Sequence, residues 1–190
     1  MSGAGTADTV VMTPPCRLAH TADLDPAELR GIRALLDHAF DGDCSDEDED
    51  HWLGGVHALI EDGEGLAAHG ALVMRRVRHR GRWLRTGYVE GVAVRADVRR
   101  TGLGGRVMAE LERVIDRAYD LGALSASDEG ALLYAARGWR CWPGQVHALS
   151  PEGIVRLPDE EGGVYVRPAL AGPLDLSGEL VFDWRDGDVV

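Results

Sequence analysis

Apolar residues recur with a helical period near the beginning of the chain. They lie three or four positions apart and so fall on one face of a helix: Leu29, Ile32, Leu36 and Phe40. Asp25 is suited to the N-cap, and Pro26 then occupies the first helical position. Glu28 follows the cap by three residues, as in a capping box. The pattern predicts an amphipathic helix that begins after residue 25.

The next ten residues, 41–50, are mostly acidic. Like charges at this density repel one another, and the run is too polar for a packed element. We therefore expect a solvated loop at 41–50.

Three segments typical of strands follow, at 56–60, 66–76 and 84–94. The connections between them are short and contain glycine, at 61–65 and 79–82. Strands joined in this way pair with their neighbours in opposite directions. These segments are therefore predicted to form an antiparallel meander.

The second half of the chain mixes helical and strand patterns. Apolar residues recur at helical spacing over 103–118, and Leu121-Gly122 is expected to stop that helix. Asp128 is expected to cap a further helix, which ends before Gly138. Short strands are predicted at 123–126, 139–149 and 163–166. This order of elements predicts an α+β fold with a mixed, mostly antiparallel central sheet flanked by helices.

Length and charge limit the possible classes of protein. The 190 residues suit one domain, which we place at 16–190, after a polar segment at 1–15 that we expect to be flexible. Lys and Arg total 20 against 32 Asp and Glu, so the net charge is −12, which disfavours nucleic acid as a partner and permits a cationic one. No apolar run reaches the ~20 residues that span a bilayer, and no secretory signal is visible. The three cysteines and seven histidines lack metal-ligand spacing. We expect a cytoplasmic protein that binds no metal, nucleic acid or membrane.

A basic, glycine-rich loop between a strand and a helix is the most informative motif. It reads Arg99-Arg100-Thr101-Gly102-Leu103-Gly104, with Gly105 following at the helix start. Glycines allow a ligand to approach the backbone, and N–H groups at a helix N-terminus attract anions. The loop is thus suited to a pyrophosphate, although a plain strand–helix turn with solvated arginines has the same pattern. No lysine follows the glycines as in a Walker-A motif, and the preceding strands are not the parallel pair of a dinucleotide-binding fold.

The Arg-x-x-Gly-x-Gly loop after antiparallel strands resembles the acetyl-CoA loop of the GCN5-related N-acetyltransferases. The later segment Leu133-Tyr134-Ala-Ala-Arg-Gly138-Trp139 is similar to the tyrosine-containing helix of that superfamily. Four further segments resemble the aminoglycoside 2′-N-acetyltransferases within it, namely residues 53–60, 88–95, 122–127 and 183–188. The resemblance extends from near Leu18 to the C-terminus.

This resemblance implies a fold of that superfamily, with acetyl-CoA as cosubstrate and a sheet that splays after the strand that carries Glu90. The thioester would lie against the backbone of Val92, Ala93 and Val94, and the pyrophosphate against residues 99–105. Glu90 is implied as the general base, acting through water, and Tyr134 as the acid towards the CoA sulfur. Glu90 also stands in an otherwise apolar strand, where an unpaired charge is costly, and this independently favours a functional role. A tyrosine such as Tyr134 is, by itself, more often a half-buried core residue.

The resemblance also implies which groups bind the acceptor. An aminoglycoside carries several ammonium groups, and each needs an acceptor oxygen on the protein. Asp43, Asp188 and the carboxylate of Val190 are implied for this role, together with Glu90. For Glu160 we favour a solvated surface position.

Three hypotheses for the function follow. The leading one is acetyl-CoA-dependent N-acetylation of the 2′-amino group of aminoglycosides, which confers resistance to these antibiotics. The second keeps the fold but acetylates another amine, in a polyamine, a cell-wall amino sugar or a protein. The third is a CoA-binding module without turnover. The resemblance further implies a homodimer.

Overall fold

The computed structural model describes residues 14–42 and 44–190 of the chain. Most of the segment predicted to be flexible, and the predicted acceptor ligand Asp43, therefore lie outside the described residues. The first part of the chain contains β1 (Cys16–His20), α1 (Pro26–Ala39), α2 (Asp46–Trp52), β2 (Val56–Asp62), β3 (Gly65–His79) and β4 (Arg82–Val94). The second part contains α3 (Leu103–Ala118), β5 (Leu121–Ser125), α4 (Asp128–Ala136), β6 (Arg140–Cys141), β7 (Val146–Ser150), β8 (Gly153–Arg156), β9 (Val164–Pro168) and β10 (Leu180–Asp183).

The described strands form one mixed sheet. Its main order is β6-β9-β5-β4-β3-β10-β7-β8, and β2 and β1 extend it beside β3. Among these strands only β4–β5 and β10–β7 are parallel pairs, and the other pairs are antiparallel. The predicted α+β fold, its mostly antiparallel sheet and the β2-β3-β4 meander are thus confirmed.

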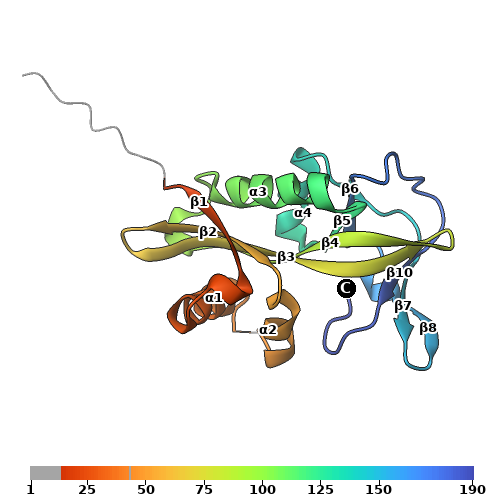
Figure 1. Cartoon of the computed structure of the whole chain (residues 1–190), viewed down its shortest axis with the longest axis horizontal. Helices are drawn as coiled ribbons and strands as arrows, with labels where there is room; N and C mark the ends of the chain where they lie inside the picture. Colours follow the sequence, from red (N-terminus) through yellow and green to blue (C-terminus); the bar gives the residue numbers. More distant parts are fainter. Residues whose placement is uncertain (1–13, 43) are drawn as a thin grey trace, which may run out of the picture.

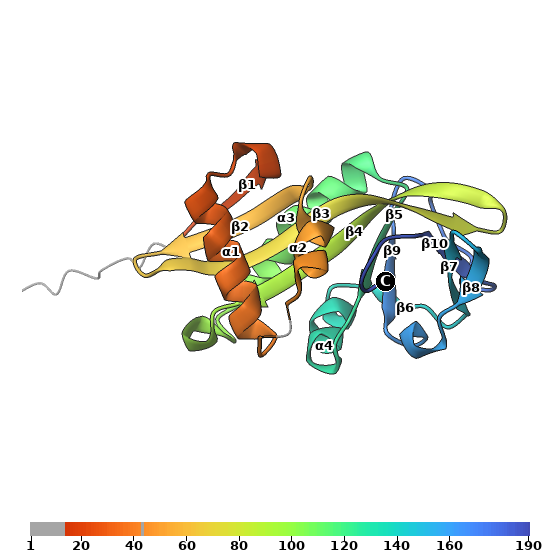
Figure 2. The same cartoon turned by 90° about the horizontal axis from the view of Figure 1, so that it is seen from below.

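Helices cover both faces of the sheet, with α3 on one face and α1 and α2 on the other (Figure 1). Val107 and Leu111 of α3 are fully buried against the sheet. Gly70 of β3 permits this close approach, because a Cβ atom there would lie 2.7 Å from Cγ1 of Val107. Seen from below, α1 and α2 lie across β3 and β4 (Figure 2). Their residues Ile32 and Trp52 are buried in the core on this side. None of the described helices is both long enough and apolar enough to cross a bilayer.

The acidic run 41–50 is the main correction to the prediction, because its second half begins helix α2 instead of forming a loop. Ser45 and Asp48 form a capping box, and the acidic first turn lies at the positive end of the helix dipole. Arg33 of α1 pairs with Glu49 at 2.6 Å. Trp52, which is 2% exposed, anchors the end of α2 in the core. Together these contacts outweigh the repulsion between the carboxylates.

Smaller corrections concern the ends of elements. α1 begins with the predicted capping box at Asp25, and α3 has the predicted bounds. However, Leu121-Gly122 belongs to β5, and Ser127 rather than Asp128 is the N-cap of α4. The predicted strand 139–149 is interrupted between β6 and β7. The short strands β1, β8 and β10 were not predicted, because each pairs with a partner distant in sequence or at the edge of the sheet.

Strand β4 leaves its neighbour β5 partway along its length. Their parallel pairing ends at Tyr88 and Ala123, whereas β4 continues beside β3 to Val94. A β-bulge at Gly91, whose φ is 53°, shifts the register between β4 and β3. Beyond Tyr88, the described strands therefore offer β4 no partner on its β5 side. This is the splayed sheet that the resemblance implied.

Candidate active site

Glu90 lies on β4 just past the point where β5 diverges. Its side chain is 16% exposed, and its carboxylate forms an ion pair with the guanidinium of Arg185. Burial raises the pKa of Glu90, while the charge and hydrogen bond of Arg185 oppose that rise. A carboxylate with a raised pKa takes up protons nearer to neutral pH, which suits a general base.

Residues 184–190, which we call the C-terminal tail, are fixed to the sheet by Arg75 of β3. Nε of Arg75 donates to Oδ1 of Asp183 at 2.9 Å, and Nη2 donates to the Asp183 carbonyl at 2.6 Å. Nη1 of the same side chain donates to the carbonyl of Val189 at 2.6 Å. Arg75 thus holds the chain at both ends of the C-terminal tail.

The ring of Tyr88 forms the base of this cluster. The guanidinium groups of Arg75 and Arg185 lie 5.0 and 5.4 Å from its centroid, within the range of cation–π interactions. Nε of Arg185 also donates to the carbonyl of Asp188 at 2.7 Å. The Tyr88 hydroxyl is buried and has no hydrogen-bond partner among the described residues. Arg185 is therefore placed by one carboxylate, one carbonyl and one aromatic face.

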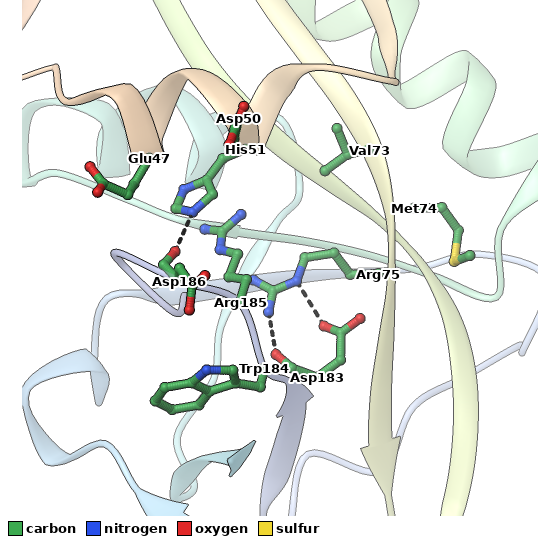
Figure 3. Close-up of a pocket in the computed structure, with 10 residues that line it drawn as sticks. All are labelled: Glu47, Asp50, His51, Val73, Met74, Arg75, Asp183, Trp184, Arg185 and Asp186. Atoms are coloured by element: carbon green, nitrogen blue, oxygen red, sulfur yellow. Dashed lines mark hydrogen bonds and ion pairs between the residues drawn. The ribbon is translucent and has the colours of Figure 1, made fainter. Parts of the chain in front are cut away.

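A pocket of about 630 Å³ opens beside Arg185, between α2, β3 and the C-terminal tail (Figure 3). Its lining includes four carboxylates, those of Glu47, Asp50, Asp183 and Asp186. Nε2 of His51 donates to the carbonyl of Asp186 at 2.7 Å and so joins α2 to the tail. Trp184 also lines the pocket and is 43% exposed, which leaves an aromatic face for a sugar ring. Several carboxylates with one aromatic face suit a polycationic ligand.

The predicted acceptor residues come together only in part. Asp188 is exposed, and its carbonyl rather than its carboxylate contacts Arg185. Val190 is 6% exposed and packs its side chain in the apolar cluster that contains Tyr88. Glu160, for which we expected a solvated position, is half-buried, 3.5 Å from Oγ of Ser125. Burial and the charge of Asp188 raise the pKa of Glu160, so this carboxyl is electrostatically coupled to the C-terminal tail.

The glycine-rich loop leaves the N-terminus of α3 open to an anion. Gly102 is the N-cap, with a φ of 90°, and has no side chain that could accept the first N–H groups of the helix. The other three described α-helices are capped by the side chains of Asp25, Ser45 and Ser127. The N–H groups at the start of α3 are therefore available to a phosphate oxygen.

Arg99 and Arg100 of this loop can add positive charge to a phosphate site. The preceding Arg95 is not available for this, because it is already paired at 2.7 Å with both Asp62 and Asp97. Arg99 and Arg100 are exposed, and neither forms an ion pair with another described residue. The predicted residues Val92, Ala93 and Val94 precede the loop, on the part of β4 that pairs with β3 but has no partner on its β5 side among the described strands. The chain thus supplies open backbone, helix N–H groups and two cations in succession, which fits a CoA-type ligand.

Tyr134 lies on α4 and is 7% exposed. Burial raises the pKa of its hydroxyl to about 12, so the group stays protonated at neutral pH, as an acid must. The end of α4 is fixed to α3 through Glu112, which accepts hydrogen bonds from Arg137 at 2.8 and 2.7 Å and from Nε1 of Trp139 at 2.9 Å. The two predicted catalytic side chains lie on different elements, Tyr134 on α4 and Glu90 on β4. No hydrogen bond joins them in the described part of the chain.

Comparison with known proteins agrees with this architecture. A family model described as an acetyltransferase (GNAT) domain matches residues 21–141. The chain is a GNAT acetyltransferase. In sequence, it is 48% identical over 176 residues to the aminoglycoside 2′-N-acetyltransferase of Mycolicibacterium fortuitum, across 91% of this chain and 90% of that protein.

Solved structures share the fold of this GNAT acetyltransferase at low sequence identity. The GNAT family N-acetyltransferase YhbS of Escherichia coli, solved in complex with CoA, matches with a TM-score of 0.63 at 20% identity, over 95% of this chain and 93% of that one. ElaA of Escherichia coli matches with a TM-score of 0.59 at 17% identity, over 81% and 99%. At these sequence identities, both similarities show a shared fold and nothing about the substrate.

Three residues of the site in this GNAT acetyltransferase had not been singled out in the sequence. They are Arg75, Arg185 and His51. Arg75 had a usable signal, because an arginine within the strand-like segment 66–76 needs a counter-charge once the strand is buried. Arg185 and His51 had none, since their partners come from segments distant in sequence.

Proposed function

We propose that this GNAT acetyltransferase transfers the acetyl group of acetyl-CoA to the 2′-amino group of aminoglycosides and thereby confers resistance to them. The observation that carries the proposal is the position of Glu90. This buried carboxylate lies at the splay between β4 and β5, and Arg185 connects it to a pocket rich in carboxylates. The relative from Mycolicibacterium fortuitum, whose name states this activity, supports the choice of acceptor.

The residues that would hold acetyl-CoA follow β4 into α3. The open backbone of Val92, Ala93 and Val94 would accept the thioester arm. The N–H groups at the start of α3, with Arg99 and Arg100, would bind the pyrophosphate. Acetyl-CoA supplies the activated acyl group, and the chain supplies orientation, proton transfer and charge stabilisation.

Glu90 and Tyr134 would divide the proton transfers between them. The 2′-ammonium must lose a proton before its nitrogen can attack the thioester carbonyl, and Glu90 accepts that proton through a water molecule. Attack forms the new C–N bond and breaks the C–S bond. The nitrogen then loses its second proton to water, Tyr134 donates a proton to the departing sulfur and is reprotonated from water, and one proton is released overall. Backbone N–H groups on the open edge of β4 are suited to stabilise the oxyanion.

The pocket would bind the remaining ammonium groups of the acceptor. Glu47, Asp50 and Asp186 line it and carry carboxylates that would pair with these groups. Trp184 offers a flat surface for a sugar ring. Asp43, Asp188 and Val190 stay predictions for this role.

A pair of aminoglycosides that differ at one position tests the proposal. Kanamycin B carries an amine at the 2′ position, where kanamycin A carries a hydroxyl. Release of free thiol from acetyl-CoA should be rapid with kanamycin B and at background with kanamycin A. Equal rates with both would exclude the 2′-amine as the target. A higher kcat/KM for a polyamine, an amino sugar of the cell wall or a protein amine would favour the second hypothesis, and CoA binding without turnover of any amine the third.

We also propose that the chain forms a homodimer and is located in the cytoplasm. The first is implied by the resemblance to the aminoglycoside 2′-N-acetyltransferases. The second is consistent with the charge and the cysteine content of the sequence. Sedimentation of the purified chain and fractionation of the producing cells would test them.

A further inference from the structure

Arg185 occupies the position on Glu90 that an ammonium group of the acceptor would need. The guanidinium lines the pocket on one side and pairs with the buried carboxylate on the other. We propose that Arg185 is a placeholder cation, which neutralises Glu90 while the acceptor is absent and is exchanged for the 2′-ammonium when the acceptor binds. The inference rests on the proposed function, because it requires a cationic acceptor at Glu90.

Glu90 needs a counter-ion while no acceptor is bound. A carboxylate that is 16% exposed is costly to leave without a counter-ion. Three other titratable or charged groups face Glu90, from β3, α2 and β4: Arg75, His51 and Tyr88. Arg75 and His51 already donate hydrogen bonds to the segment 183–189. Burial and the nearby charge of Glu90 raise the pKa of Tyr88, so its hydroxyl stays neutral. Arg185 is thus the direct counter-ion of Glu90. When the 2′-ammonium group of the acceptor replaces it, Glu90 keeps a counter-ion throughout.

The exchange of Arg185 for the acceptor also determines whether Glu90 has a proton donor. A guanidinium stays protonated at every pH at which proteins work, so the pair of Glu90 and Arg185 cannot transfer a proton. An alkylammonium group has a lower pKa and can give its proton to a buried carboxylate through the bridging water of the proposed mechanism. Replacing Arg185 by the acceptor therefore converts an inert ion pair into one that can start the reaction.

The C-terminal tail is attached at its two ends, separately from the contact between Arg185 and Glu90. Arg75 fixes Asp183 at one end of the tail and Val189 at the other, through three hydrogen bonds of 2.6 to 2.9 Å. Between these anchors, Arg185 contacts only Glu90, the Asp188 carbonyl and the Tyr88 ring among the hydrogen bonds and ring contacts of the described residues. The side chain can therefore leave Glu90 while both ends of the tail stay in place.

The test compares two pH profiles of the variant Arg185→Gln with kanamycin B as acceptor. The acid limb of kcat/KM reports Glu90 before the acceptor binds, and the acid limb of kcat reports it in the complex. Loss of the Arg185 cation raises the pKa of Glu90, so the acid limb of the kcat/KM profile should move to higher pH by about 1 to 3 units. The limb of kcat should stay where it is in the wild type, because Arg185 has already left Glu90 in the complex. The ionisation of kanamycin B affects the profiles of wild type and variant equally, so it does not contribute to the difference between them.

Arg113→Gln is the matched control, since it removes one positive charge from the exposed face of α3, and neither limb should move. Equal shifts of both limbs in Arg185→Gln would overturn the placeholder, because Arg185 would then remain on Glu90 in the complex. No shift in either limb would overturn it as well. These outcomes differ from a failure of the proposed function, in which kanamycin B is not acetylated or Glu90→Gln retains full activity.

The wild-type chain provides a second measurement that does not depend on the folding of Arg185→Gln. The Nη–H signals of Arg185, which include the proton that Nη1 donates to Glu90, are assigned by their absence in Arg185→Lys and followed by NMR in the presence of CoA. Saturating kanamycin B should accelerate their exchange with water at least tenfold, as the bond to Glu90 is lost. Unchanged exchange would overturn the proposal.

Discussion

Nδ1 of His57 lies 3.0 Å from Nε2 of His69, and both residues are completely buried. Nδ1 of His69 donates to the carbonyl of Gly91 at 2.8 Å, so its Nε2 must accept the proton of His57. Nε2 of His57 then accepts from the hydroxyl of Thr21 at 2.8 Å. The two neutral imidazoles form one directed chain of hydrogen bonds that ends on the bulge next to Glu90.

Because this chain requires two neutral rings, stability should fall as the pH falls. Burial lowers the pKa of His57 to about 4 and that of His69 to about 3, below the ~6.5 expected in the unfolded chain. Between these values the unfolded state binds more protons, so the stabilisation is complete above pH ~6.5 and is lost towards pH ~3. Each ring should contribute a slope of up to about 1.4 kcal/mol per pH unit to the free energy of unfolding. Urea denaturation at pH 7.5, 6 and 5 measures this slope.

His57→Gln separates the contribution of one ring from the rest of the acid sensitivity. The variant should be less stable at neutral pH but should show a smaller slope between pH 6 and 5. His38→Gln, on the exposed face of α1, is the matched control and should keep the wild-type slope. An unchanged slope in His57→Gln would show that the buried pair does not govern the pH dependence.

Tyr134→Phe should lower kcat and leave the KM values nearly unchanged. Loss of a general acid typically costs about 10² in rate or more. Because burial raises the pKa of Tyr134 to about 12, no loss of activity from its ionisation is expected below pH ~10 in the wild type. Tyr165→Phe, whose ring centroid lies 6.3 Å from that of Tyr134, is the control and should retain activity. Comparable kcat values for the two variants would remove Tyr134 from the mechanism.

Arg99→Gln should weaken the binding of CoA in a salt-dependent way. A charge-assisted hydrogen bond is worth about 1.5–3 kcal/mol, so Kd should rise about tenfold or more. Isothermal titration with CoA at two ionic strengths measures the loss, and the difference from wild type should shrink at high salt. Arg95→Gln provides the contrast, because Arg95 is already neutralised by Asp62 and Asp97 and should affect folding more than CoA affinity.

Asp50→Asn should raise the KM for kanamycin B and leave the KM for acetyl-CoA unchanged. The Asp50 side chain lines the carboxylate pocket, and loss of one partly screened ion pair corresponds to about 1 kcal/mol, or severalfold in KM. Asp46→Asn is the matched control on the same helix, because Asp46 is 98% exposed and does not line the pocket. If both variants raise KM equally, the effect is due to overall charge and not to the pocket.

The elements that the sequence predicts well are those whose signals are local. The capping box at Asp25 and the apolar face of 103–118 define α1 and α3, and turn residues define the β2-β3-β4 meander. Helix α2 was missed because its stability depends on Arg33 and Trp52, which both lie outside the acidic run 41–50. The residues of the acidic run, taken by themselves, favour a loop.

The same distinction holds for the site. Glu90 stands out in the sequence as a charge within an apolar strand, and the glycine-rich loop identifies the start of α3. The pairing of Glu90 with Arg185 is not visible there, because it depends on β10 pairing with β3 and on Arg75 holding the C-terminal tail. Contacts between distant segments carry no periodic signal.

The position of the acetyl group on the product from kanamycin B and acetyl-CoA decides whether the proposed reaction is correct. Two-dimensional NMR of the purified product assigns the amide to one nitrogen. We predict a single acetyl group on the 2′ nitrogen with the wild type, and no product above background with Glu90→Gln. An acetyl group on any other amine of kanamycin B, or an unchanged yield with Glu90→Gln, would contradict the proposed roles of the pocket and of Glu90.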